Sequence, residues 1–250
     1  MRLELSTGGY LDYHLTPGPN PGGTLVVFVH GYGSHQGGDK AVYFRDRVAA
    51  LGAGYLAFDL RGHGASSGTM DDLTLSGGIG DLQAIMDGPA AGFGRVQLIG
   101  SSMGGQIAAW YAARFPERVA ANVLIAPAFA FYENRLRDLG ADGIREIAAT
   151  GRARIQNQWV DLTIGRALLE DAAGYVLSEL TRSYKTPTLI LHGTADTTVA
   201  PEGSVTFVRR AHARPLDLVL IGGGDHRLTE HKAYLFDLMR AFWARLGRAV

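Results

Sequence analysis

Two Gly-x-Ser-x-Gly patterns occur in the sequence, and they differ in what surrounds the serine. The pattern at residues 64–68 centres on Ser66 and lies in a glycine-rich stretch with no strand-like run before it. The pattern at residues 100–104 centres on Ser102, with a short apolar run before it and a segment of helical spacing after it. A sharp strand-to-helix turn lifts a serine hydroxyl above the edge of a sheet, and the flanking glycines leave room for its strained backbone. We therefore expect Ser102 to be a nucleophile and Ser66 to belong to a loop.

A base and an acid that could activate this serine occur further along the chain. A serine hydroxyl attacks well only when a base takes its proton and a carboxylate holds that base in one tautomer. Asp196 and His226 each lie in a loop that closely follows an apolar run. The order Ser102, Asp196, His226 is the order expected for a triad built on alternating strands and helices. Asp225 adjoins His226 and should point elsewhere, so we expect Asp196 to be the acid.

Two backbone N–H groups could stabilise negative charge on a carbonyl oxygen. The sequence HGYG occupies residues 30–33, in the loop after the first long apolar run, and Met103 opens the segment after Ser102. We expect the N–H groups of Tyr32 and Met103 to form an oxyanion hole, the second helped by the positive end of its helix. His30 is expected to support the loop rather than to take part in the chemistry.

The elements that would position these residues alternate along the chain. Strands are predicted by unbroken apolar runs at residues 24–29, 54–58, 96–99, 119–125, 188–191 and 216–221. Helical spacing occurs at residues 41–51, 75–86, 104–115, 201–211 and 231–246. Strand then helix, repeated, predicts an α/β fold with a mostly parallel central sheet and helices on both faces. Residues 3–6 and 10–15 predict a hairpin at a sheet edge.

Residues 128–185 interrupt this alternation. They contain helical pieces at residues 132–139 and 165–180 and no clear pair of strands. We expect one domain over residues 1–250, with residues 128–185 inserted as a small cap over Ser102. The aromatic side chains of the cap are candidates for a substrate pocket, and ordinary packing within the cap would explain each of them equally well. They are Phe129, Phe131, Tyr132 and Trp159.

The amino-acid composition limits the kinds of molecule that the protein is expected to bind. The 24 Lys and Arg residues balance 24 Asp and Glu residues, so we expect a small-molecule substrate and no nucleic acid. The chain has no Cys, which excludes disulfides and thiolate chemistry and is compatible with the cytoplasmic location that we expect. No apolar run of about 18 residues predicts a membrane span, and an acidic residue near the start argues against a signal peptide. No cluster has metal-ligand spacing, so we expect neither metal nor cofactor.

Five motifs, taken in order, resemble the α/β-hydrolase family. They are residues 30–33, Asp59–Gly64, Gly100–Gly105, His192–Asp196 and Gly224–His226. The stretches Gly38–Ala41 and Asp225–Arg227 are also similar to the branch that includes the mitochondrial acyl-protein thioesterases and acyl-glucuronide esterases. The resemblance implies an α/β-hydrolase fold over nearly the whole chain.

Taken together, these residues predict a serine carboxylic-ester hydrolase. It would act on a small or medium acyl ester through an acyl-enzyme formed on Ser102. Two alternatives remain open. The same residues would serve an acyl-thioesterase, and a small-molecule receptor on a hydrolase scaffold could keep a triad. The sequence does not indicate which oligomeric state the protein adopts.

Overall fold

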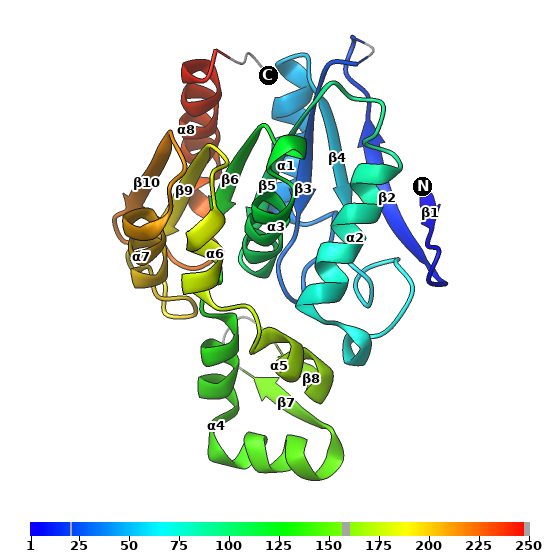
Figure 1. Ribbon diagram of the computed structural model, residues 1–250, viewed down its shortest axis with the longest axis vertical. Helices are drawn as coiled ribbons and strands as arrows, with labels where there is room; N and C mark the ends of the chain where they lie inside the picture. Colours follow the sequence, from blue (N-terminus) through cyan, green and yellow to red (C-terminus); the bar gives the residue numbers. More distant parts are fainter. Residues whose placement is uncertain (21, 157–160, 248–250) are drawn as a thin grey trace.

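The computed structural model describes residues 1–20, 22–156 and 161–247 of the 250-residue chain. An eight-stranded sheet at its centre has the order β1-β2-β4-β3-β5-β6-β9-β10 (Figure 1). The strands β4, β3, β5, β6, β9 and β10 run parallel to one another. At one edge β2 pairs antiparallel with β4 and forms the predicted antiparallel hairpin with β1. The bounds are β1 Arg2–Glu4, β2 Tyr10–Thr16, β3 Thr24–Val29, β4 Gly54–Phe58, β5 Arg95–Ser101, β6 Ala121–Ile125, β9 Thr188–Gly193 and β10 Leu216–Ile221. The mostly parallel sheet predicted from the sequence is confirmed.

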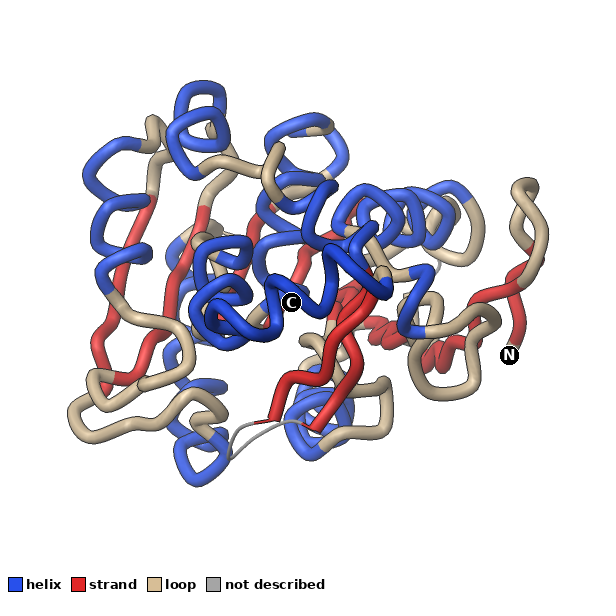
Figure 2. Tube along the Cα trace, turned by 90° about the horizontal axis from the view of Figure 1, so that it is seen from below, coloured by secondary structure: helices blue, strands red, loops and turns tan. Residues whose placement is uncertain are grey.

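The central strands are apolar throughout because helices cover both faces of the sheet. Every residue of β4 and β9 is buried. Figure 2 shows the helices lying on both sides of the strands. The helices α1 (Asp39–Ala50) and α8 (Lys232–Arg245) pack into one buried cluster, and α2 (Leu75–Asp87), α3 (Met103–Arg114) and α7 (Glu202–Arg210) pack into the other. Cover on both faces is what a parallel sheet requires.

The strand order reverses between β3 and β5. The chain passes from β3 outward to β4, then crosses back to β5 and continues to β6 on the opposite side. The carboxyl ends of the two strands adjoin, because Val29 is paired with Gly100. Loops that leave neighbouring strands in opposite directions open a crevice at that edge of the sheet, where ligands of such folds bind.

Residues 128–185 are called the insert below. Its residues 131–156 and 161–172 lie beyond this edge, at the bottom of Figure 1, whereas residues 177–183 lie beside the sheet. The insert contains α4 (Phe131–Thr150), β7 (Arg152–Gln156), β8 (Asp161–Gly165), α5 (Arg166–Ala172) and α6 (Leu177–Ser183). Its helices agree in part with the prediction, but the expectation of no strand pair is wrong, because β7 and β8 form an antiparallel pair. Buried Ala153 and Ile155 alternate with exposed neighbours in β7, a period of two that is hard to detect over five residues.

The longest helix of the insert is bent. Gly140 interrupts α4 with φ 61° and ψ −172°, a conformation that favours glycine. The first helical piece of α4 therefore ends at about Leu139, as the sequence pattern predicted, and a second piece follows Gly140 and continues to Thr150. None of the helices within the described ranges is both long and apolar enough to cross a membrane.

Candidate active site

Ser102 lies on the sharp turn between β5 and α3. Its backbone has φ 56° and ψ −118°, a strained combination for a residue with a side chain. Two glycines allow this turn to pack closely. A Cβ atom on Gly100 would lie 2.5 Å from the carbonyl oxygen of Gly104, and one on Gly104 would lie 2.2 Å from the carbonyl oxygen of Val29. The Gly-x-Ser-x-Gly spacing is thus required by backbone contacts on both sides of the serine.

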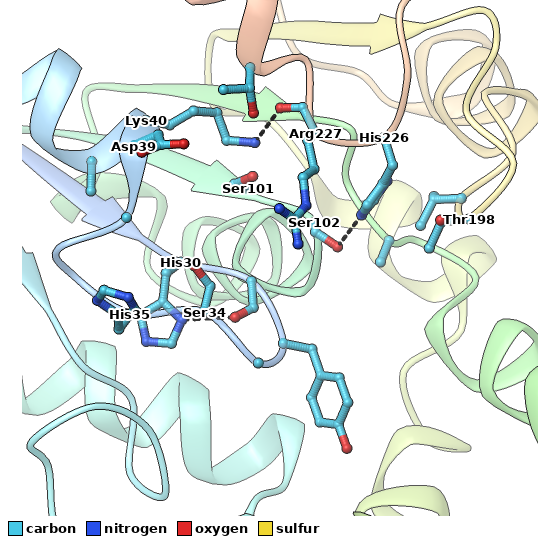
Figure 3. A pocket seen from close by; sticks show the side chains of 18 of the residues that line it. His30, Ser34, His35, Asp39, Lys40, Ser101, Ser102, Thr198, His226 and Arg227 are labelled. Carbon is cyan, nitrogen blue, oxygen red and sulfur yellow. Dashed lines mark hydrogen bonds between the residues drawn. The ribbon is translucent and has the colours of Figure 1, made fainter. Parts of the chain in front are cut away.

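The structure brings the three predicted side chains together in one line of hydrogen bonds. His226 Nε2 lies 3.0 Å from Ser102 Oγ (Figure 3), and His226 Nδ1 lies 2.7 Å from Asp196 Oδ2. An ionised carboxylate only accepts, so Nδ1 carries the proton and the neutral ring accepts from the serine hydroxyl at Nε2. The three residues follow β5, β9 and β10, so the parallel sheet places them at one edge.

Asp196 is held in its ionised form. Its Oδ1 accepts the backbone N–H groups of Thr198 at 2.9 Å and Val199 at 2.8 Å. Burial opposes ionisation, but hydrogen bonds from His192 and His226 outweigh it and hold the pKa of Asp196 well below its usual value. Asp196 is therefore a fixed negative charge beside the His226 ring.

His192 is a further site residue, one to which the sequence reasoning gave no role. Its Nε2 lies 2.9 Å from the carbonyl oxygen of Val199 and 3.1 Å from Asp196 Oδ2, and its Nδ1 lies 2.8 Å from Ser204 Oγ. Since a carbonyl only accepts, Nε2 carries the proton and donates. His192 thus donates to Oδ2, the same carboxylate oxygen that accepts from His226. The spacing of His192 and Asp196 within one motif was the available signal.

The HGYG loop after β3 packs against the serine turn. A Cβ atom on Gly31 would lie 3.1 Å from Ser102 Cβ, so the backbone of the loop passes directly beside the nucleophile candidate. His30 Nε2 accepts the backbone N–H of Leu60 at 3.0 Å. Burial, with the neighbouring His63, lowers the pKa of His30 to about 4, which keeps its ring neutral and able to accept. His30 therefore supports the HGYG loop. Tyr32, two residues later in this loop, lines the same hollow as Ser102.

The side chain of Tyr32 links this loop to the insert. Its hydroxyl donates to the carbonyl oxygen of Thr163 in β8 at 3.2 Å. Its ring meets the ring of Phe131 edge-on at 6.1 Å, and the guanidinium of Arg135 lies 5.9 Å from its centre. The insert therefore contacts the same residue whose N–H was predicted to hold an oxyanion. The N–H of Met103, the other predicted donor, is the first of α3 and has no acceptor within that helix.

A hollow of about 410 Å³ opens above Ser102 and His226. Of the aromatic candidates, Phe131 lines it. The prediction for Phe129 is corrected, because its ring stacks on Phe207 at 4.6 Å and is buried in the core. Tyr132 is corrected too, since it lines a separate hollow within the insert. Trp159 lies outside the described residues. Polar side chains that line the hollow include Ser34, Lys40, Asn134, Arg135 and Arg227.

The second serine motif has a different role. Ser66 Oγ accepts the backbone N–H of Asp12 at 2.8 Å and donates to the carbonyl oxygen of Asp59. Ser66 fastens a loop to the edge of the sheet. In the part of the chain that the structure describes, no three His, Asp or Glu side chains are grouped so that they could hold a metal ion.

Comparison with known proteins identifies the family of this chain. A model of the alpha/beta hydrolase family matches residues 26–249. The chain belongs to this family. It is 28% identical over 223 residues to the mitochondrial palmitoyl-protein thioesterase ABHD10 of Bos taurus, covering 88% of this chain and 71% of that protein. It is also 28% identical over 255 residues to a monoacylglycerol lipase of Mycolicibacterium smegmatis, covering 89% of each.

A solved structure shares nearly the whole fold. The crystal structure of a putative hydrolase from Agrobacterium vitis superimposes with a TM-score of 0.87 at 28% identity, covering 96% of both chains. The family match, together with the thioesterase and lipase names of these relatives, supports an enzyme of the hydrolase class.

Proposed function

We propose that this protein is a serine carboxylic-ester hydrolase that works through an acyl-enzyme. The observation that carries the proposal is the line of hydrogen bonds from Ser102 through His226 to Asp196, with distances of 3.0 and 2.7 Å. This is the arrangement in which a neutral imidazole can take a serine proton while a carboxylate stabilises the resulting charge. It lies on the floor of a hollow that is large enough for a small ligand.

The reaction follows from the positions of these groups. Ser102 Oγ attacks the carbonyl carbon of the ester while His226 Nε2 takes the hydroxyl proton. The imidazolium is stabilised by ionised Asp196, and the oxyanion accepts hydrogen bonds from the N–H groups of Tyr32 and Met103. His226 returns the proton to the alkoxide oxygen as the C–O bond breaks, which releases the alcohol. Water then attacks the acyl carbon while His226 takes its proton. The bond from that carbon to Ser102 Oγ breaks, His226 returns the proton to Oγ, and the carboxylic acid leaves.

A screen of p-nitrophenyl esters of graded acyl length tests this proposal. We expect multiple turnovers, an initial burst of p-nitrophenol and the highest kcat/KM at short or medium acyl chains. The Ser102→Ala variant should be inactive in the same screen, and the Ser66→Ala variant should match the unchanged protein. Absence of hydrolysis across the series, with the folded state verified, would contradict an esterase.

Acyl-thioesterase activity is the second candidate, favoured by the names of the ABHD10 relatives. The triad would serve it equally, because attack on a thioester uses the same base and oxyanion hole and differs in releasing a thiol. Acyl-CoA thioesters of matched chain length, assayed beside the esters, distinguish the two. A higher kcat/KM for the thioester at every length would favour the thioesterase. A single slow turnover with all acyl substrates would instead favour a small-molecule receptor on this scaffold.

A further inference from the structure

Lys40 lines the hollow from the first turn of α1. Its Nζ donates to the backbone carbonyl of Arg227 at 2.6 Å, a contact between residues 187 positions apart in the chain (Figure 3). Lys40 and Arg227 both line the hollow above Ser102. The bond therefore joins the start of α1 to the loop after β10, two segments that belong to different ends of the chain.

The carbonyl that accepts this bond belongs to the residue directly after His226. Other contacts fix the loop on both sides. The carbonyl of Gly224 accepts the N–H of Ala195 at 2.9 Å, and Asp225 Oδ1 accepts the N–H of Leu228 at 2.7 Å. The side chain of Leu228 is buried. The bond from Lys40 falls between these anchors, one peptide unit from the ring that faces Ser102.

We propose that Lys40 is a positioning residue that keeps the His226 ring within hydrogen-bond reach of Ser102 by holding the carbonyl of Arg227. The proposal rests on the proposed function, because it assigns His226 the role of base. Small displacements of such a base are costly, since a misplacement of about 1 Å can reduce turnover roughly 100-fold. Lys40 itself touches no reacting atom in this account.

The positive charge on Lys40 strengthens this hydrogen bond at pH values below about 8. Burial lowers the pKa of Lys40 to about 8, and Arg227 acts in the same direction, while Asp225, Asp196 and Asp39 oppose the shift. A hydrogen bond from an ammonium is roughly twice as strong as one from a neutral amine. As the pH rises through about 8, Lys40 loses its proton and the hold on the loop weakens.

The test compares Lys40→Met and Lys40→Arg with a matched control, Lys232→Met. Lys232 lies at the start of α8, over the ring of Tyr43, and away from the hollow. We expect Lys40→Met to lower kcat roughly 10- to 100-fold with little change in KM. The substitution removes the hydrogen bond that holds the loop and leaves the contacts with the substrate in place. Lys40→Arg should restore most of kcat, and Lys232→Met should leave it unchanged.

The dependence of kcat on pH separates positioning from general structural damage. The unchanged protein should lose activity as the pH rises through about 8, whereas Lys40→Met and Lys40→Arg should show no decline there. A Lys40→Met variant with unchanged kcat, or with the same alkaline decline, would overturn the proposal.

A crystal structure of Lys40→Met provides an assay-independent test. We expect the distance from His226 Nε2 to Ser102 Oγ to exceed the 3.0 Å of the unchanged protein. An unchanged distance would overturn the positioning role, even if the protein cleaved no ester. If the unchanged protein also cleaved no ester, the proposed function would have failed, and the distance in Lys40→Met would still decide the role of Lys40.

Discussion

The two walls of the hollow are held in different ways. The wall formed by the sheet edge depends on close backbone packing, in which Gly31 passes beside Ser102 and Gly104 lies against β3. The wall formed by the insert depends on side chains, such as the Tyr32 hydroxyl on Thr163 and the ion pair of Arg135 with Asp138 at 2.6 Å. Close backbone packing leaves little room for displacement, whereas side-chain contacts can be lost one at a time. The sheet edge should therefore determine whether reaction occurs, and the insert should adjust its rate.

The largest effect is expected at the sheet edge. Ser102→Ala and His226→Ala should each lower kcat by roughly 10⁵- to 10⁶-fold, because either change removes a member of a unit that acts together. Steady-state hydrolysis of the best p-nitrophenyl ester measures this loss. Ser66→Ala is the matched control and should keep full activity. A Ser102→Ala variant with more than a small residual rate would place the nucleophile elsewhere.

Replacing the acid should have the next largest effect. Asp196→Asn keeps the shape of the side chain but removes the charge that fixes the His226 tautomer, so kcat should fall by about 10⁴-fold. Glu133→Gln, an exposed carboxylate of the insert, serves as the control in the same assay. If Glu133→Gln proved the more damaging change, the acid would belong to the insert and the contrast between the two walls would fail.

Lowering the pH should destabilise the folded protein, because His30 at the sheet edge is buried in its neutral form. Burial, with His63 nearby, lowers the pKa of His30 to about 4, below the 6.5 of an exposed histidine. The unfolded chain then binds more protons between pH 6.5 and 4, so the free energy of unfolding should fall as the pH drops through that range. The loss should reach about 3 kcal/mol. Urea unfolding at several pH values measures it, and stability that stays constant from pH 7 to 4 would contradict a neutral buried His30.

The smallest effect is expected where the insert meets the HGYG loop. Tyr32→Leu keeps the backbone N–H but removes the ring and hydroxyl contacts to Phe131 and Thr163. We expect kcat to fall about 10-fold, since the oxyanion donor remains but is less well held. Binding of a trifluoromethyl ketone, which forms a tetrahedral adduct, should weaken by the same factor. Tyr43→Leu is the control, because Tyr43 lies in α1 and packs on the other face of the sheet. Equal losses of kcat in both variants would indicate a general loss of stability instead.

The sheet edge could be predicted from the sequence because its determinants are local. The glycines around Ser102 and the apolar run before it lie within a few residues of one another. Alternation of strands and helices then places Asp196 and His226 at the same edge, since parallel strands end together. These features were enough to predict both the fold and the three residues that the structure brings together.

The insert wall and the supporting contacts could not be predicted in the same way. The strand pair β7 and β8 is short, and whether an aromatic side chain faces a pocket or the core depends on packing that spacing does not encode. Phe129 and Phe131 are two residues apart, yet one stacks on Phe207 and the other lines the hollow. The bond from Lys40 to Arg227 joins positions 187 residues apart, and no sequence pattern specifies such a pair.

Trapping the acyl-enzyme tests the central claim most directly. The protein is mixed with a p-nitrophenyl ester, quenched in acid during the burst, digested and analysed by mass spectrometry with fragmentation between Ser101 and Ser102. We predict a mass increase equal to one acyl group, located on Ser102 and absent from the Ser102→Ala variant. An acyl group on Ser66 or Ser101, or turnover without any covalent adduct, would contradict the account.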